Sequence, residues 1–213
     1  MIKGIIFDMD EVIVDSGHLH LRAWQEFLAK YGKPHTEEEF KKYFGVINFE
    51  LFDLLLPEIS KDKHMELDDE KETLYRKYAD LELLPLPGVK DLIQKLHKNG
   101  FKLIVGSSGN PKNIEFNLKK LDLFDFFEGY VSSHDVKKGK PNPEVFLKSA
   151  QKLGLKPSEC VVIEDADHGV VAAKAAGMKV IAITSTHDKQ KLINADLIVE
   201  NLDEITIEKI RKF

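Results

Sequence analysis

The sequence predicts an α/β protein in which a doubly wound, mostly parallel sheet carries an inserted α-helical cap. The first observation is that apolar runs of strand length alternate with segments of helical period over residues 82–213. Strands that alternate with helices form parallel crossover units, with helices on both faces of the sheet. The second observation is that residues 17–80 contain only helix-like stretches. A helical block between the first and second strands indicates a separate small domain.

The expected elements follow from the spacing of apolar residues. Strands are expected over residues 2–7, 102–106, 130–132, 161–163, 180–184 and 197–199. Helices of the sheet-containing domain are expected over residues 88–99, 111–121, 143–153 and 167–176. Helices of the inserted block are expected over residues 18–31, 36–44, 48–56 and 62–79. We therefore expect a core domain of residues 1–15 and 82–213, and a helical cap domain of residues 16–81.

Composition narrows the range of partners. The chain of 213 residues has a formal net charge of −5, which argues against nucleic acid, because phosphate contacts need a basic face. Cys160 is the only cysteine, so no intrachain disulfide can form. No apolar run approaches the roughly 18 residues that a membrane span requires, and the N-terminal residues lack a signal-peptide pattern. We therefore expect a cytoplasmic protein with no membrane or nucleic-acid partner.

Two aspartates end the first expected strand. Asp8 and Asp10 directly follow an apolar run. Ligands of open α/β sheets bind beyond the carboxyl ends of the strands, so both carboxylates are expected at a binding site. Like charges this close together are unfavourable unless a cation or a proton relieves them. The pair therefore indicates a divalent metal or an acid–base function.

Polar groups that suit one kind of chemistry follow other strands. Ser107 and Ser108 offer hydroxyl groups and turn amides to phosphate oxygens. Lys140 precedes a helix and supplies a positive charge. Glu164 and Asp165 suit a hard cation such as Mg²⁺. Each residue alone could be a helix cap, a turn residue or a solvated side chain. Together, and without a thiol or histidine cage, they indicate phosphoryl chemistry and not a zinc site.

In this order, these residues resemble the four motifs of the haloacid dehalogenase-like superfamily. The motifs are Asp8-Met9-Asp10-Glu11-Val12, Ser107, Lys140 before a proline, and Glu164-Asp165. The resemblance covers the whole chain. The helical block is similar to the cap of the β-phosphoglucomutase and phosphoglycolate phosphatase subgroup. The residues that carry this second likeness are Asp15-Ser16, His20, Arg22-Ala23-Trp24 and Gly45-Val46.

The resemblance implies phosphoryl transfer in two steps. Asp8 would attack phosphorus and form an aspartyl-phosphate, and Asp10 would act first as general acid and then as general base. Mg²⁺ would be held by Asp8, the main-chain carbonyl of Asp10, and Asp165, with Glu164 in support. The transferred group would be bound, and its charge stabilised, by Ser107, Ser108 and Lys140.

Three functions remain open on these residues. The favoured one is Mg²⁺-dependent hydrolysis of a small phosphorylated metabolite. The second is a β-phosphoglucomutase-like isomerase, which His20 favours. Against it, the cap loop after Gly45-Val46 reads Ile47-Asn48-Phe49-Glu50, where a mutase would place an arginine, and residues 108–111 do not resemble a second phosphate grip. The third is a non-catalytic phospho-accepting module, against which the helical insertion argues, because lids of this kind serve enzymes.

Four further residues bear on specificity. His20, Trp24 and Asn48 are candidates to contact the substrate, although Trp24 also belongs to an apolar set of helical spacing that indicates a role in the core of the cap. Glu11 stands where the related proteins usually have glycine. Its side chain is expected to add negative charge near the metal or to protrude toward the cap.

Overall fold

Six parallel strands form the main sheet of the protein, in the order β5-β4-β1-β6-β7-β8. The structure, a computed structural model, describes residues 1–43 and 45–213. The strands are β1 (Gly4–Phe7), β4 (Lys102–Gly106), β5 (Tyr130–Val131), β6 (Cys160–Glu164), β7 (Lys179–Ile183) and β8 (Leu197–Val199). The predicted fold class, a doubly wound parallel sheet with a helical insertion, is confirmed.

Strand β1 lies in the middle of this sheet, and all four of its residues are buried. It pairs with β4 on one side and with β6 on the other. Ile5 and Phe7 contribute to the apolar core on one face, whereas Ile6 contributes to the core on the other. Because successive side chains of a strand point to opposite faces, this continuous apolar run is what a strand covered on both sides requires.

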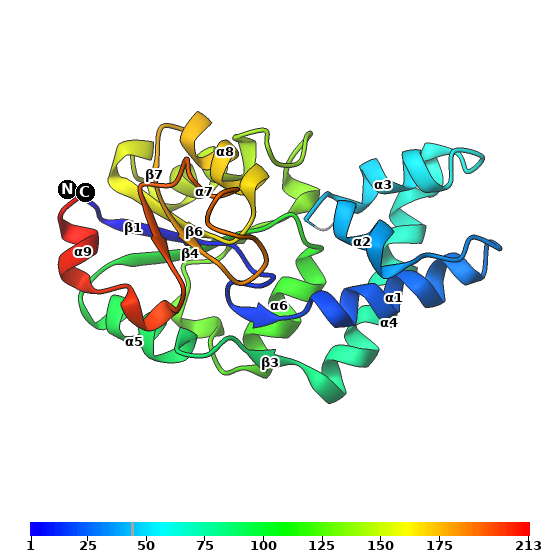
Figure 1. The fold of residues 1–213 in the computed structure, drawn as a ribbon, viewed down its shortest axis with the longest axis horizontal. Coiled ribbons are helices and arrows are strands. Elements are labelled where there is room, and N and C mark those ends of the chain that lie inside the picture. The colour runs from blue at the N-terminus through cyan, green and yellow to red at the C-terminus, as the bar shows by residue number, and fades with distance from the viewer. Residues whose placement is uncertain (44) are drawn as a thin grey trace.

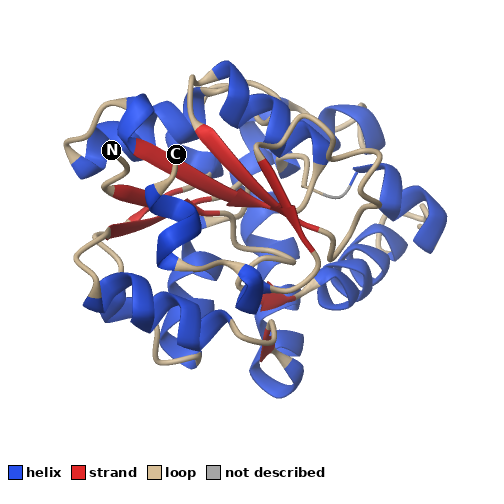
Figure 2. Ribbon diagram, turned by 60° about the vertical axis from the view of Figure 1, so that its left-hand side comes forward, coloured by secondary structure: helices blue, strands red, loops and turns tan. Residues whose placement is uncertain are grey.

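Helices cover both faces of the sheet (Figure 2). The core that contains Ile5 and Phe7 is completed by α5 (Val89–Lys98), α6 (Pro111–Lys120) and α9 (Ile207–Arg211). The opposite core, around Ile6, is completed by α7 (Glu144–Leu153) and α8 (Asp167–Ala175). The described residues also form short 3₁₀ helices: η1 (Lys61–Lys63), η2 (Phe124–Phe126), η3 (Ser133–Asp135), η4 (Pro157–Glu159) and η5 (Leu202–Glu204).

Among the described residues, four helices form the insertion between the first and second strands of the main sheet, and they lie to the right of it in Figure 1. They are α1 (Gly17–Ala29), α2 (Glu37–Tyr43), α3 (Asn48–Leu55) and α4 (His64–Glu82). The insertion has an apolar cluster of its own, which includes Trp24, Phe27, Leu28 and Phe52. The helix expected over residues 36–44 is described to residue 43, and α4 continues three residues beyond its expected end.

The chain passes between the core and the insertion in two segments, and these two segments pair with each other. Strand β2 (Val14–Asp15) lies antiparallel to β3 (Leu84–Pro85). Neither strand was predicted, because two residues are too few to show a periodicity and one of them is a proline. The pairing fixes the entry and exit of the insertion at one place. No helix within the described residues combines the length and apolar character needed to cross a membrane.

Candidate active site

Three neighbouring strands of the sheet bring the predicted polar residues to one edge. Asp8 follows β1, Ser107 follows β4 and Glu164 ends β6, and β1 pairs with both of the other strands. All three residues are buried. Together with Asp10, Ser108, Lys140 and Asp165, they line one small cavity at the carboxyl end of the sheet. The structure therefore brings together the residues that the sequence analysis placed at separate strand ends.

Lys140 lies between two carboxylates at this edge. Its Nζ atom donates to Oδ1 of Asp8 at 2.7 Å and to Oε1 of Glu164 at 2.5 Å. Burial acts to lower the pKa of Lys140, but the charges and hydrogen bonds of Asp8 and Glu164 outweigh it and raise the pKa above its ordinary value. Lys140 is therefore a fixed ammonium group beside Asp8, although 132 residues separate the two in the chain.

Three carboxylates form a buried acidic cluster around this lysine. One oxygen from each of Asp8, Glu164 and Asp165 lies within 4.8 Å of the others. Burial raises the pKa of Asp8 to about 7, with Glu164 and Asp10 adding to the effect and Lys140 opposing it. Burial and the negative charges of Glu164 and Asp8 also raise the pKa of Asp165 well above its usual range. A cluster of hard oxygen donors that repel one another in this way could bind a divalent cation, because the cation removes the repulsion.

The two neighbouring acids in this cluster have different partners. Glu164 accepts hydrogen bonds through Oε2 from the main-chain amides of Asp165 and Ala166, so that it also orders the turn before α8. Asp165 accepts a hydrogen bond from the hydroxyl of Thr186. The Glu164 side chain passes so close to α8 that a Cβ atom on Gly169 would lie 1.9 Å from its Oε1. A side chain at residue 169 would therefore have to displace the Glu164 carboxylate from its partners.

Asp10 lies beside the acidic cluster and contacts the insertion through one carboxylate oxygen. Its Oδ1 atom accepts a hydrogen bond from the Ser16 hydroxyl at 2.5 Å and lies 3.3 Å from Nε2 of His20. Burial acts to raise the pKa of Asp10, but His20, Ser16 and Lys71 outweigh it, so the pKa lies below its ordinary value. The Asp10 side chain is thus held by residues of the insertion.

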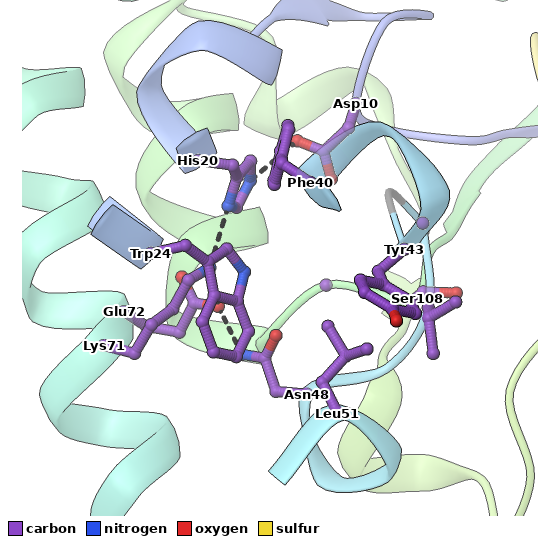
Figure 3. A pocket seen from close by; sticks show the side chains of 13 residues that line it. Asp10, His20, Trp24, Phe40, Tyr43, Asn48, Leu51, Lys71, Glu72 and Ser108 are labelled. Carbon is purple, nitrogen blue, oxygen red and sulfur yellow. Dashed lines mark hydrogen bonds and ion pairs between the residues drawn. The ribbon is translucent and has the colours of Figure 1, made fainter. Parts of the chain in front are cut away.

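A pocket extends from Asp10 into the interface between the core and the insertion (Figure 3). His20, Trp24 and Asn48, the three predicted substrate contacts, all line it. Trp24 is also part of the apolar cluster of the insertion, as its helical spacing predicts, whereas its contact with a substrate stays a prediction. Ser108 lines both this pocket and the smaller cavity at Asp8, which means that the two spaces are adjacent.

Comparison with known proteins agrees with this arrangement. The family model of the haloacid dehalogenase-like hydrolases matches residues 5–183. The chain belongs to this family. It is an enzyme of the phosphatase type, since phosphatases of the same family are at least 30% identical to it over most of both chains.

Relatives with two different activities are similar to this haloacid dehalogenase-like hydrolase over nearly their whole length. Hexitol phosphatase A of Escherichia coli is 32% identical, covering 97% of this chain and 94% of the relative. The β-phosphoglucomutase of Bacillus subtilis is 28% identical, covering 99% and 94%. A solved β-phosphoglucomutase from Clostridium difficile has a TM-score of 0.89 and 27% identity, and the match covers 100% of this chain and 96% of that one. Its relatives thus include phosphatases and phosphosugar mutases.

Glu11, the residue that departs from the usual family pattern, has a local partner. Its backbone has a positive φ of 58°, which is uncommon for residues other than glycine. Its Oε1 atom accepts hydrogen bonds from the main-chain amides of Ser16 at 3.0 Å and Gly17 at 2.7 Å. The side chain thus folds back onto the first amides of α1, at the start of the insertion. That it adds negative charge near a metal stays a prediction.

The sequence analysis missed several charged residues of helix α4. Lys71 and Glu72 line the pocket, and both are almost completely buried. The Lys71 ammonium donates to Oε1 of Glu72 at 2.8 Å and lies 3.0 Å from Nδ1 of His20. Asp68, one turn earlier, is 2% exposed. Six of the seven residues 66–72 are charged, so the sequence shows no apolar pattern there. Only the packing of the insertion against the core decides which of these charges are buried.

Proposed function

We propose that the protein is a Mg²⁺-dependent phosphatase that hydrolyses small organic phosphomonoesters through an aspartyl-phosphate on Asp8. The observation that carries the proposal is the position of the Lys140 ammonium, 2.7 Å from Asp8 in a buried acidic cluster. A carboxylate can attack an anionic phosphate only where positive charge offsets the repulsion, and the buried lysine supplies part of that charge.

In the first step, an Asp8 oxygen attacks phosphorus while the bond from phosphorus to the ester oxygen breaks. Asp10 enters this step protonated, although its contacts lower its pKa in the free enzyme. It donates this proton to the departing oxygen, so that the product leaves as a neutral alcohol. In the second step, Asp10 accepts a proton from water, the water oxygen attacks phosphorus, and the bond to Asp8 breaks. Inorganic phosphate leaves and both aspartates return to their starting states. The contacts of Asp10 with the insertion, beside the acidic cluster, support its use as the proton-transfer group.

The metal ligands in this proposal are the side chains of Asp8 and Asp165 and the main-chain carbonyl of Asp10, with Glu164 in support. The oxygen-only donor set fits Mg²⁺. When bound, Mg²⁺ would supply positive charge against the phosphoryl oxygens. The remaining oxygens would be bound by Ser107, Ser108 and Lys140, all of which line the cavity at Asp8.

We further propose that residues 16–81 act as a cap domain over a core of residues 1–15 and 82–213. The loop of the insertion approaches the core closely at Gly45, where a Cβ atom would lie 2.5 Å from Nε2 of His168. Closure of the cap would exclude bulk water from Asp8 and leave room for one nucleophile. The paired strands β2 and β3 would serve as the hinge, because both connections between the two parts pass through them.

Hydrolysis is favoured over isomerisation because the pocket offers few cationic groups to bind a second phosphate. A mutase must hold a second phosphate while the first is transferred, which calls for a second set of cationic groups. In this chain the cap loop of residues 47–50, where a mutase would have an arginine, contains none. Asn48 of this loop lines the pocket with a neutral amide. The mutase remains the alternative candidate, supported by His20, which contacts Asp10.

The proposal is tested with a panel of hexose and pentose monophosphates, 2-phosphoglycolate and β-glucose 1-phosphate. Release of inorganic phosphate is measured with Mg²⁺ and again after chelation. We expect Mg²⁺-dependent release from at least one substrate and none from the Asp8→Asn variant. Conversion of β-glucose 1-phosphate to glucose 6-phosphate without phosphate release would favour the mutase. Absence of phosphoryl transfer from every substrate would overturn both.

A further inference from the structure

Two buried carboxylates of helix α4 accept hydrogen bonds from the side chain of Asn48, which lines the pocket together with one of the two, Glu72 (Figure 3). Asp68 and Glu72 lie one turn apart, and each is 2% exposed. The Asn48 side-chain amide donates to Oδ1 of Asp68 at 2.7 Å and to Oε1 of Glu72 at 2.6 Å. Both hydrogens of this amide are therefore engaged by carboxylates of the insertion itself.

The same carboxylates also accept hydrogen bonds from the core. Asn110, at the N-terminus of α6, donates to Oδ2 of Asp68 at 2.6 Å, and Nε2 of His134 lies 2.9 Å from that oxygen. Glu72 accepts in the same way from the side-chain amide of Asn113. Asn48 of the insertion and Asn110 of the core are thus both hydrogen-bonded to Asp68, a carboxylate of the protein itself.

Charge around Asn48 is unfavourable for a second phosphate. Burial acts to raise the pKa of Asp68, but hydrogen bonds with His134, Asn48 and Asn110 outweigh it and keep the pKa below its ordinary value. Asp68 is therefore ionised at neutral pH.

The cationic groups of the pocket are already paired. Among the described residues that line the pocket, only His20 and Lys71 can carry positive charge. Lys71 is paired with Glu72 and lies 3.0 Å from Nδ1 of His20. A phosphate placed here would meet Glu72, which lines the pocket, and the charge of Asp68 behind the Asn48 amide. The lysine beside it is already paired with Glu72. Like charges brought together disfavour binding.

Resting on the phosphatase function proposed above, we propose that Asp68 is a specificity-determining residue that acts as a built-in anion. It occupies the amides of Asn48 and Asn110 and thereby restricts the enzyme to monophosphates whose non-reacting end is uncharged. Hydroxyl groups at that end are compatible with the site, because a hydroxyl can donate to a carboxylate oxygen. A second phosphate is not.

The test compares matched pairs of substrates: fructose 1-phosphate with fructose 1,6-bisphosphate, and glucose 6-phosphate with glucose 1,6-bisphosphate. For the wild-type enzyme we expect kcat/KM for the bisphosphate to be lower by about 100-fold or more in whichever pair is hydrolysed. In Asp68→Asn the preference for the monophosphate should fall at least about tenfold, because the negative charge is removed at nearly constant volume. The matched control is Asp69→Asn, which makes the same change at an exposed neighbour on α4 and should leave the preference unchanged.

The outcomes separate this inference from the proposed function. Wild-type hydrolysis of a bisphosphate within about threefold of its monophosphate would overturn the inference and leave the phosphatase function intact. An unchanged preference in a folded Asp68→Asn variant, as judged by its thermal unfolding, would also overturn it. The wild-type ratio needs no variant, so it decides the question even where Asp68→Asn does not fold. Absence of phosphate release from all four compounds would count against the phosphatase function itself and so against the inference built on it.

Discussion

A Cβ atom on Gly169 would lie 1.9 Å from Oε1 of Glu164, the oxygen that accepts from Lys140. Gly169→Ala should therefore displace Glu164 and disturb the position of Lys140, although alanine ordinarily stabilises a helix interior by about 0.5–1 kcal/mol relative to glycine. We expect kcat to fall by about 10²-fold, the effect of a small misplacement of reacting groups. Steady-state kinetics measures this.

A matched control exists at Gly154, which has a positive φ of 68° and no atom within 4 Å of an added Cβ. Gly154→Ala should lower the melting temperature through backbone strain and leave kcat unchanged. Equal losses of activity in the two variants would contradict the specific role given to Gly169.

Lys140→Ala should lower kcat by about 10²–10³-fold, by analogy with the removal of one donor to a developing anion. Removing the lysine also leaves Asp8 and Glu164 buried without their shared cation, so the variant should be less stable as well. The exposed Lys138 provides the control, since Lys138→Ala removes the same charge two residues away. Turnover near that of the wild type in Lys140→Ala would count heavily against its assigned role.

Asp165→Asn should affect the metal-free protein and the Mg²⁺-bound protein in opposite ways. Asp165→Asn removes one of three mutually repelling buried carboxylates, so the metal-free protein should melt at a higher temperature than the wild type. In the wild type, Mg²⁺ at 100 times its Kd should add about 2.7 kcal/mol of stability. Most of this gain should be lost in Asp165→Asn.

Differential scanning fluorimetry with and without Mg²⁺ measures both effects on stability. Asp167→Asn, at an exposed carboxylate, should show neither. An undiminished Mg²⁺ shift in Asp165→Asn would place the metal elsewhere.

Glu11→Gly should leave the free energy of unfolding nearly unchanged while altering activity. Glycine removes the cost of the left-handed backbone, about 1–2 kcal/mol for other residues, but it also removes the acceptor for the Ser16 and Gly17 amides, worth about 1 kcal/mol. Ser16 donates to Asp10, so loosening this segment should lower kcat about threefold to tenfold. Glu11→Gln, which keeps an acceptor oxygen, should retain more activity than Glu11→Gly. Identical kinetics in both variants and the wild type would make Glu11 neutral.

The residues at strand ends were predictable because two independent patterns coincide there. A short, continuous apolar run identifies a buried strand, and the polar residues that end it must lie at the sheet edge. This reasoning places Asp8, Ser107 and Glu164 together without knowledge of the helices between them. It does not give the direction of a side chain, and so the turn of Asp10 toward Ser16 and His20 required the structure.

The buried charges of α4 were not predictable, because burial there is decided by tertiary contacts. Asp68 is buried and Asp69 is exposed, yet in the sequence they are adjacent and identical. Asp68 is buried only because Asn48, Asn110 and His134 surround its carboxylate, and these residues come from three separate segments. Short elements such as β2 and β3 escape prediction for a related reason, since their pairing depends on where the two segments that join the core to the insertion meet.

Mass spectrometry of the acid-quenched enzyme tests the central proposal most directly. The enzyme is mixed with a hydrolysed sugar monophosphate and Mg²⁺, quenched within one turnover and digested with a protease. We predict the mass of one phosphoryl group on Asp8, formed no more slowly than kcat and absent from Asp8→Asn. A phosphoryl group on another residue, or full turnover with Asp8 unmodified at every time point, would contradict the account.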